Sequence, residues 1–138
     1  MHMKIRQMNP EALVPYESNP RIITQEAIEE CVKSIENTAG KLQQPVVVDV
    51  NLEIIVGHTR TQAAIALGLK KIPVHVADYL TEEQVKTYRI ADNKTGELAE
   101  WDNDLLKIEF EQLEEMNVDL SLTSFSEPEI AEIMVDDV

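Results

Sequence analysis

The 138-residue chain is long enough for one domain with a hydrophobic core, and 43% of its residues are hydrophobic, as in ordinary globular proteins. Its net charge of −14 lies wholly in the second half, because residues 1–76 contain 8 acidic and 8 basic residues and residues 77–138 contain 18 acidic and 4 basic residues. Such an acidic surface argues against indiscriminate DNA binding by this chain alone, and a solvated helix face is its simplest explanation.

Neither export nor membrane insertion is indicated by the sequence. No apolar run approaches the roughly 20 residues that a membrane span needs. The first residues, Met1 to Ile5, form no apolar signal region. We therefore expect a cytoplasmic protein without a membrane partner. A single cysteine, Cys31, also excludes an internal disulfide and a cysteine-rich zinc site.

The first forty residues predict a strand, an irregular segment and a helix. Residues 4–8 alternate polar and apolar side chains, which is typical of a strand. Three prolines between residues 9 and 21 favour an extended, irregular path, and Asn19-Pro20-Arg21 is a turn signal that carries a basic side chain. Thr24 then has the position of an N-cap for a helix that ends near Gly40.

The middle of the chain predicts three more strands and one helix. Residues 46–50 form a valine-rich strand buried on both faces, and residues 54–56 form the next strand, antiparallel to it because the connection is short. A helix follows and ends at Gly68. Residues 72–76 form the last strand, in which Pro73 favours a strand start or a sheet edge.

The turn between the strand at residues 54–56 and the following helix carries the strongest functional signal. Three β-branched residues lead directly into Gly57. A strand that turns directly into a helix aims the free N–H groups of the helix at one point, which makes an anion site. His58, Thr59 and Arg60 add an imidazole, a hydroxyl and a guanidinium, all of which suit phosphate oxygens. Spacing alone leaves open a plain strand–turn–helix corner with a surface arginine.

The second half is predicted to be helical. A capping box at residues 81–84 starts a helix that continues to about Ile90, and a polar cluster at residues 92–96 then interrupts the pattern. Trp101 opens another helix, and a second capping box at residues 126–129 starts a short last one. We interpret Trp101 as a core anchor, since no aromatic neighbours accompany it as a base-stacking platform.

Four segments of this sequence suit a single anion if the fold brings them together. They are residues 19–21, residues 43–45, residues 57–60 and the pair at 92–93, whose oxygens suit a magnesium ion that bridges phosphates. The order of these segments resembles the N-terminal domain of the ParB/sulfiredoxin superfamily. The likeness covers about residues 3–95, and the continuation looks like the branch found in phages and at the front of DNA-modification methyltransferases.

The resemblance implies an α+β fold in which residues 1–95 form a small mixed sheet with packed helices. Residues 96–138 would form an acidic helical part that either belongs to the same compact unit or docks a partner. The resemblance also implies a bound nucleoside triphosphate with magnesium, either CTP as in the chromosome-partition proteins or ATP as in sulfiredoxins and a free-serine kinase. By the same resemblance, Asp92 and Asn93 match a pair that assists metal and triphosphate, with Asp92 as the magnesium ligand. The residues assigned to nucleotide and phosphate are Asn19, Arg21, Gln44, Gly57, His58, Thr59, Arg60 and Thr61.

Three departures from the family pattern limit the chemistry. His58 and Thr59 replace the Glu and the first Arg of the usual partition-protein turn. The cysteine that sulfiredoxins carry in this turn is absent, which argues against sulfiredoxin chemistry. Asp92 is one methylene shorter than the Glu of the family pair. Family members are also labelled as nucleases, but no metal-ligand cluster in this sequence supports DNA cleavage.

These observations lead to three hypotheses. The first is a nucleotide-binding module whose triphosphate controls docking to a DNA-acting partner, to a fused DNA-modification module or to a second copy of itself. The second is an enzyme, either a nucleotide hydrolase or a small-molecule kinase, that uses Asp92 and magnesium. The third is an acidic protein-interaction domain. We find no helix-turn-helix after the domain and no methyltransferase motif, so we expect any contact with DNA to be indirect.

Overall fold

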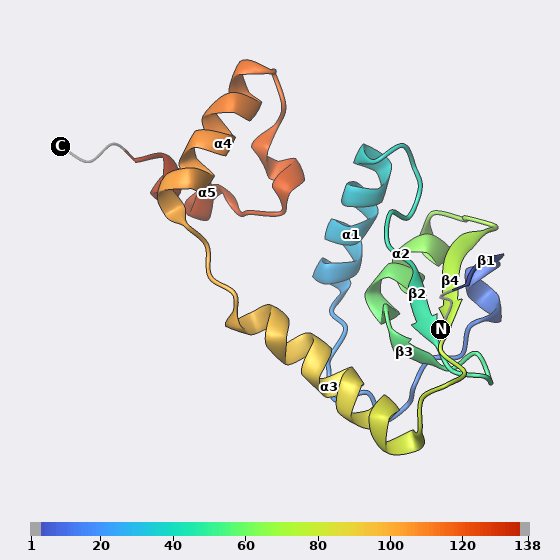
Figure 1. Cartoon of the computed structure of the whole chain (residues 1–138). Coiled ribbons are helices and arrows are strands. Elements are labelled where there is room, and N and C mark those ends of the chain that lie inside the picture. The colour runs from blue at the N-terminus through green and yellow to red at the C-terminus, as the bar shows by residue number, and fades with distance from the viewer. Residues whose placement is uncertain (1–3, 136–138) are drawn as a thin grey trace. The chain divides into compact units, whose positions relative to one another are not determined.

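The computed structural model describes residues 4–135 and divides the chain into two compact units that meet between Leu98 and Ala99. The first unit contains a four-stranded sheet in the order β1-β4-β2-β3 (Figure 1). β2 and β4 run parallel and the other neighbours run antiparallel, so the predicted α+β fold with a mixed sheet is confirmed. The strands are β1 (Ile5–Met8), β2 (Val46–Val48), β3 (Ile54–Val56) and β4 (Ile72–Val76).

One face of this sheet forms the core of the first unit. Val46, Val48, Ile72 and Val74 are each 0% exposed, and the period-two alternation of a strand turns them to the same side. Two helices, α1 (Gln25–Asn37) and α2 (His58–Ala66), contribute apolar side chains to the same cluster. A short 3-10 helix, η1 (Pro10–Ala12), contacts α2. The N-terminus of α2 is therefore held at the end of β3 by a packed core.

Two details of the strands differ from the sequence prediction. β2 ends at Val48 rather than at residue 50, because the Oδ1 atom of Asp49 accepts hydrogen bonds from the backbone of Asn51 at 2.8 Å and of Glu53 at 2.9 Å and so closes the turn. Pro73 lies near the start of β4 as predicted, but β4 is an inner strand between β1 and β2. The alternative of an edge position is wrong.

Helix α3 (Glu82–Leu98) begins as predicted and ends later than predicted. Thr81 and Gln84 exchange the two hydrogen bonds of a capping box, at 2.9 and 3.2 Å. The expected interruption at residues 92–96 is wrong, because the helix continues through it. Polar side chains there bond to carbonyls of their own helix: Asn93 Nδ2 donates to Arg89 O at 2.9 Å.

The second unit contains α4 (Asn103–Glu115), a short 3-10 helix η2 (Leu120–Thr123) and α5 (Glu127–Met134). Asp102 caps α4, and the predicted capping box at residues 126–129 is present at α5. Phe110 is 1% exposed and anchors this small core. Trp101 is 68% exposed, so its interpretation as a core anchor is wrong. Within residues 4–135, no helix combines the length and apolar character that a membrane span requires.

Candidate functional site

The predicted strand–turn–helix corner is present, and Gly57 is required there. Gly57 is the N-cap of α2 and has a φ of 112°, in the left-handed region that other residues rarely adopt. A Cβ atom at this position would lie 3.2 Å from Nη2 of Arg60 and 3.2 Å from both γ-methyl groups of Val46. Thr61, which is 2% exposed, donates through its hydroxyl to the carbonyl of Gly57 at 2.8 Å. Thr61 therefore braces the turn and does not face the cavity beside it.

The first turn of α2 opens onto a cavity of about 170 Å³. No side chain in the described part of the chain caps this helix, so its first N–H groups remain suited to an anion. The cavity brings together every predicted site residue except Gln44 and Thr61. Its lining is Asn19, Arg21, Ile23, Ile55, Val56, Gly57, His58, Thr59, Arg60, Arg89, Asp92 and Asn93.

Gln44 is exposed and lies outside this lining. Its neighbour Pro45 contributes instead through the backbone, because the carbonyl of Pro45 accepts a hydrogen bond from Nη2 of Arg60 at 3.1 Å. That bond fixes the guanidinium of Arg60 beside Gly57. The Gln-Pro segment thus supports the site by holding an arginine that lines it.

Arg89 of α3 is the main site residue that the sequence prediction missed. It is 3% exposed, its Nη2 donates to the carbonyl of Ile54 at 3.1 Å, and its Cζ lies 3.6 Å from the ring centroid of Tyr16. The signal that points to it is spacing, because Arg89 precedes Asp92 by three positions and Asn93 by four on one helix. Because the sequence prediction ended this helix near Ile90, it placed Arg89 and Asp92 on different elements and missed their common face.

Arg60 and Arg89 bring positive charge to the cavity, and neither is paired with a carboxylate in the part of the chain that the structure describes. In each, the Nε atom is buried and has no hydrogen-bond partner. A buried charged donor without a partner costs free energy, and an anion between the two would relieve that cost.

His58 ties the N-terminal segment to the start of α2. Its Nε2 accepts a hydrogen bond from the backbone N–H of Tyr16 at 3.1 Å, which places the ring proton on Nδ1. Burial, and secondarily the charge of Arg89, lower the pKa of His58 below its ordinary value of 6.5. The imidazole is therefore neutral at pH 7 and positions the segment that leads to Asn19 and Arg21.

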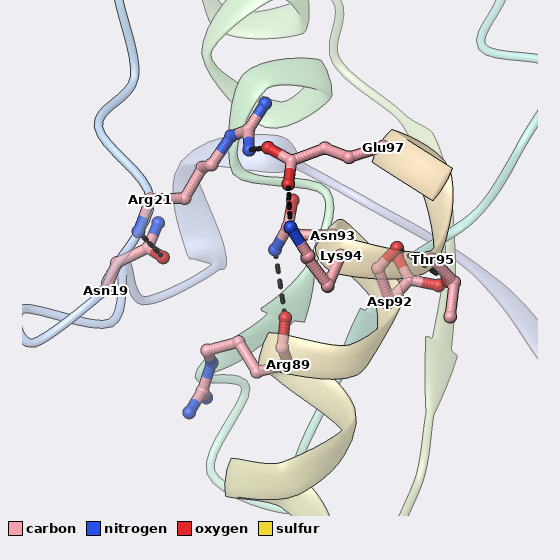
Figure 2. Close-up of polar contacts among 8 residues, drawn as sticks. All are labelled: Asn19, Arg21, Arg89, Asp92, Asn93, Lys94, Thr95 and Glu97. Carbon is pink, nitrogen blue, oxygen red and sulfur yellow. Dashed lines mark hydrogen bonds and ion pairs between the residues drawn. The ribbon is translucent and has the colours of Figure 1, made fainter. Parts of the chain in front are cut away.

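Arg21, which lines the cavity, forms an ion pair with Glu97, which lies outside the lining (Figure 2). Arg21 Nη1 lies 2.7 Å from Oε1 of Glu97, and Lys94 Nζ lies 3.5 Å from Oε2 of the same carboxylate. The hydrogen bond from Arg21, followed by that from Lys94, lowers the pKa of Glu97. Asn19 supports this arrangement because its Oδ1 accepts from the backbone N–H of Arg21 at 3.1 Å. An anion that binds Arg21 would compete with this carboxylate for the guanidinium.

A larger groove of about 600 Å³ also lies in the first unit. It includes Val47 and His75, which alternate with the core residues and so face the other side of the sheet. His75 is 4% exposed, and its Nε2 lies 2.9 Å from the hydroxyl of Tyr79, so this histidine already has a hydrogen-bond partner. This groove is mainly apolar and holds no arginine, and the first turn of α3 that lines it is already capped by Thr81 and Gln84, so we place the candidate site in the smaller cavity.

Comparisons with known proteins identify relatives of both parts of the chain. The family model of the ParB N-terminal domain matches residues 2–93, and that of the ParB-methyltransferase HTH domain matches residues 104–138. The ParB-like nuclease domain-containing protein YnaK of Escherichia coli strain K12 is 39% identical over 72 residues, which cover 52% of this chain and 80% of YnaK.

Two solved structures of the C-terminally truncated chromosome-partitioning protein ParB of Caulobacter crescentus are similar in fold. The complex with CTP-γ-S has a TM-score of 0.73 and 22% identity, and the match covers 95% of this chain and 77% of that one. The complex with the centromeric parS site has a TM-score of 0.53 and 22% identity, with 94% and 64% coverage.

The match to a helix-turn-helix family corrects one sequence prediction. We expected no helix-turn-helix after the first domain, and residues 104–138 match one. The pattern was missed because α4 and α5 are separated by a connection that contains η2, and because both helices carry acidic side chains where a DNA-reading unit carries basic ones.

Proposed function

The chain belongs to the ParB N-terminal domain family, and from this premise we propose that it binds a nucleoside triphosphate in the cavity at the start of α2. In this proposal the bound nucleotide, CTP or ATP, controls docking to a DNA-acting partner, to a fused DNA-modification module or to a second copy of the chain. The solved relative from Caulobacter was crystallised with CTP-γ-S, which supports this choice of ligand class.

The observation that carries the proposal is a pair of arginines that have no carboxylate partner among the described residues. Arg60 and Arg89 line the same cavity as the first turn of α2, and each has a buried Nε without a partner. Guanidinium groups and helix N-terminal amides are both strong phosphate donors. A plain structural corner has no need for two arginines whose Nε atoms are buried without a partner, so the arrangement favours a phosphate ligand over the alternative of a surface arginine.

The size of the cavity restricts which part of a nucleotide it holds. Complete small-molecule sites are usually about 300–1,000 Å³, whereas this cavity measures about 170 Å³. It therefore suits phosphate groups, with the base lying beyond the Arg21–Glu97 pair. Arg21 is exposed and its partner is a surface carboxylate, so releasing it costs little free energy.

Magnesium fits this site only together with phosphates. No group of three or more His, Cys, Asp or Glu residues suited to a metal exists among the described residues. Asp92 lines the cavity, and magnesium is commonly held by one or two carboxylates plus substrate phosphates. Asp92 would be the protein ligand, and the ion would neutralise charge on the triphosphate.

Calorimetry with ATP, CTP and GTP, each with and without magnesium, tests the proposal. We expect one nucleotide to bind and Arg60→Ala to weaken that binding at least about tenfold, because a charge-assisted contact worth about 1.5–3 kcal/mol is lost. Arg6→Ala is the matched control, since Arg6 is exposed on β1 and lies outside the cavity. Absence of binding near millimolar concentration, or an equal loss in both variants, would refute the proposal.

A second function, nucleotide hydrolysis or small-molecule phosphorylation, is favoured by the position of Asp92 and Asn93 in the same cavity. Asn93 Nδ2 is bonded to Arg89 O, which orders this part of α3. Phosphate release by the wild type and by Asp92→Ala separates the two functions. Release that depends on Asp92 would support an enzyme, whereas equal and negligible release would leave binding alone.

A further inference from the structure

The second unit contains a groove that the nucleotide proposal does not use. It has a volume of about 520 Å³ and lies between the start of α4, Phe125 and α5. Its apolar surface comes from Trp101, Phe125, Ile133 and Val135. Trp101 is 68% exposed and Val135 is 61% exposed, so two large apolar side chains face solvent at one site.

Trp101 is held at the edge of this groove by aromatic packing. Its ring lies 5.2 Å from that of Phe125, and the ring of Phe125 lies 5.4 Å from that of Phe110, both in edge-to-face contacts. Phe110 is 1% exposed, so the series runs from the buried core to the surface. A tryptophan fixed in this way loses little conformational freedom when a partner covers it, which is a property of binding hot spots.

The rim of the groove is acidic. Asp104, Glu129 and Glu132 line it, and Lys107 is the one basic residue in the lining. The ammonium group of Lys107 donates to the carbonyl of Val135 at 3.3 Å. Over residues 99–138 the sequence has 13 acidic residues and one basic residue, a net charge of −12.

We propose that this groove docks a basic amphipathic segment of a partner protein. Apolar side chains of that segment would cover Trp101 and Phe125, and its lysines or arginines would face the carboxylates of the rim. Charge complementarity selects this occupant over duplex DNA, whose phosphates the same carboxylates repel. The inference extends the docking part of the proposed function, and its test uses no nucleotide, so the two can fail separately.

The test is fluorescence anisotropy of an 18-residue amphipathic Leu/Lys peptide titrated with the full chain, with a Leu/Glu peptide of the same pattern as control. We expect binding of the Leu/Lys peptide only, and Trp101→Ala to weaken it about tenfold. Because Trp101 is the sole tryptophan of the chain, its emission also reports on the groove directly and should change as unlabelled peptide binds.

Two paired variants distinguish the groove from general acidity. Asp104→Asn with Glu132→Gln removes two rim charges, and Glu111→Gln with Glu114→Gln removes two charges outside the groove. Glu129 is left intact because its carboxylate accepts from Ser126 N at 2.8 Å and caps α5. We expect a loss of about tenfold from the first pair and under about twofold from the second. Equal losses, no peptide binding, or a Trp101 response to duplex DNA instead of peptide would overturn the proposal.

Discussion

At the scale of single residues, the site depends on keeping its imidazole neutral beside two arginines. His58 accepts a hydrogen bond from Tyr16 N, and Tyr16 in turn stacks on Arg89. Protonation of His58 would remove the acceptor and add a third positive charge. The segment that leads to Asn19 would then lose its attachment to α2, so we expect acid to weaken both stability and the site.

Replacing His58 by Gln tests this coupling. Burial and Arg89 lower the pKa of His58 in the folded chain, whereas the unfolded chain keeps a value near 6.5. The unfolded state therefore binds more protons once the pH falls through about 6.5, and stability declines toward pH 5. Gln retains an acceptor but does not titrate. Urea unfolding between pH 8 and 5 should show a smaller decline for His58→Gln than for the wild type, and parallel curves would contradict the assignment.

At the scale of elements, the features that depend on neighbouring residues in the sequence were predicted correctly, whereas those that depend on long-range contacts were missed. The β-branched run, Gly57 and the helix after it are adjacent in sequence, and this corner was predicted correctly. Arg89 enters the cavity from α3, and the carbonyl that fixes Arg60 belongs to Pro45, so both contacts depend on tertiary packing. The same limit explains why β4 was not recognised as an inner strand.

The continuity of α3 gives a prediction at this scale. Gly96 lies within the helix and nothing lies within 4 Å of a Cβ atom added there. Gly96→Ala should raise the free energy of unfolding by about 0.5–1 kcal/mol, because alanine loses less backbone entropy in a helix. Gly68→Ala is the contrasting control: Gly68 has a φ of 71°, and alanine there should cost about 1–2 kcal/mol. Urea unfolding of both variants measures the difference. Destabilisation by Gly96→Ala would contradict the continuous helix and favour the interruption at residues 92–96 that the sequence predicted.

At the scale of the whole molecule, the two units differ sharply in charge. Residues 1–98 contain 13 acidic and 11 basic residues, a net charge of −2, whereas residues 99–138 carry −12. For the second unit, the family match suggests contact with DNA, whereas the net charge argues against it. Residues 104–138 match a helix-turn-helix family, but the second unit lacks the cations with which DNA-binding proteins neutralise phosphates.

This imbalance predicts that the chain binds duplex DNA weakly or not at all. Non-specific DNA binding arises from released counterions, and the salt dependence of affinity scales with the number of phosphates that lysines and arginines neutralise. The second unit has one basic residue, so it can neutralise almost no phosphates and gains almost no affinity from released counterions. Anisotropy of a labelled duplex of about 20 base pairs should therefore show no binding up to about 10 μM protein at about 0.15 M salt, where non-specific Kd values are typically about 1–100 μM. Tight binding with a steep salt dependence would contradict this prediction and would show that cations of the first unit contact DNA.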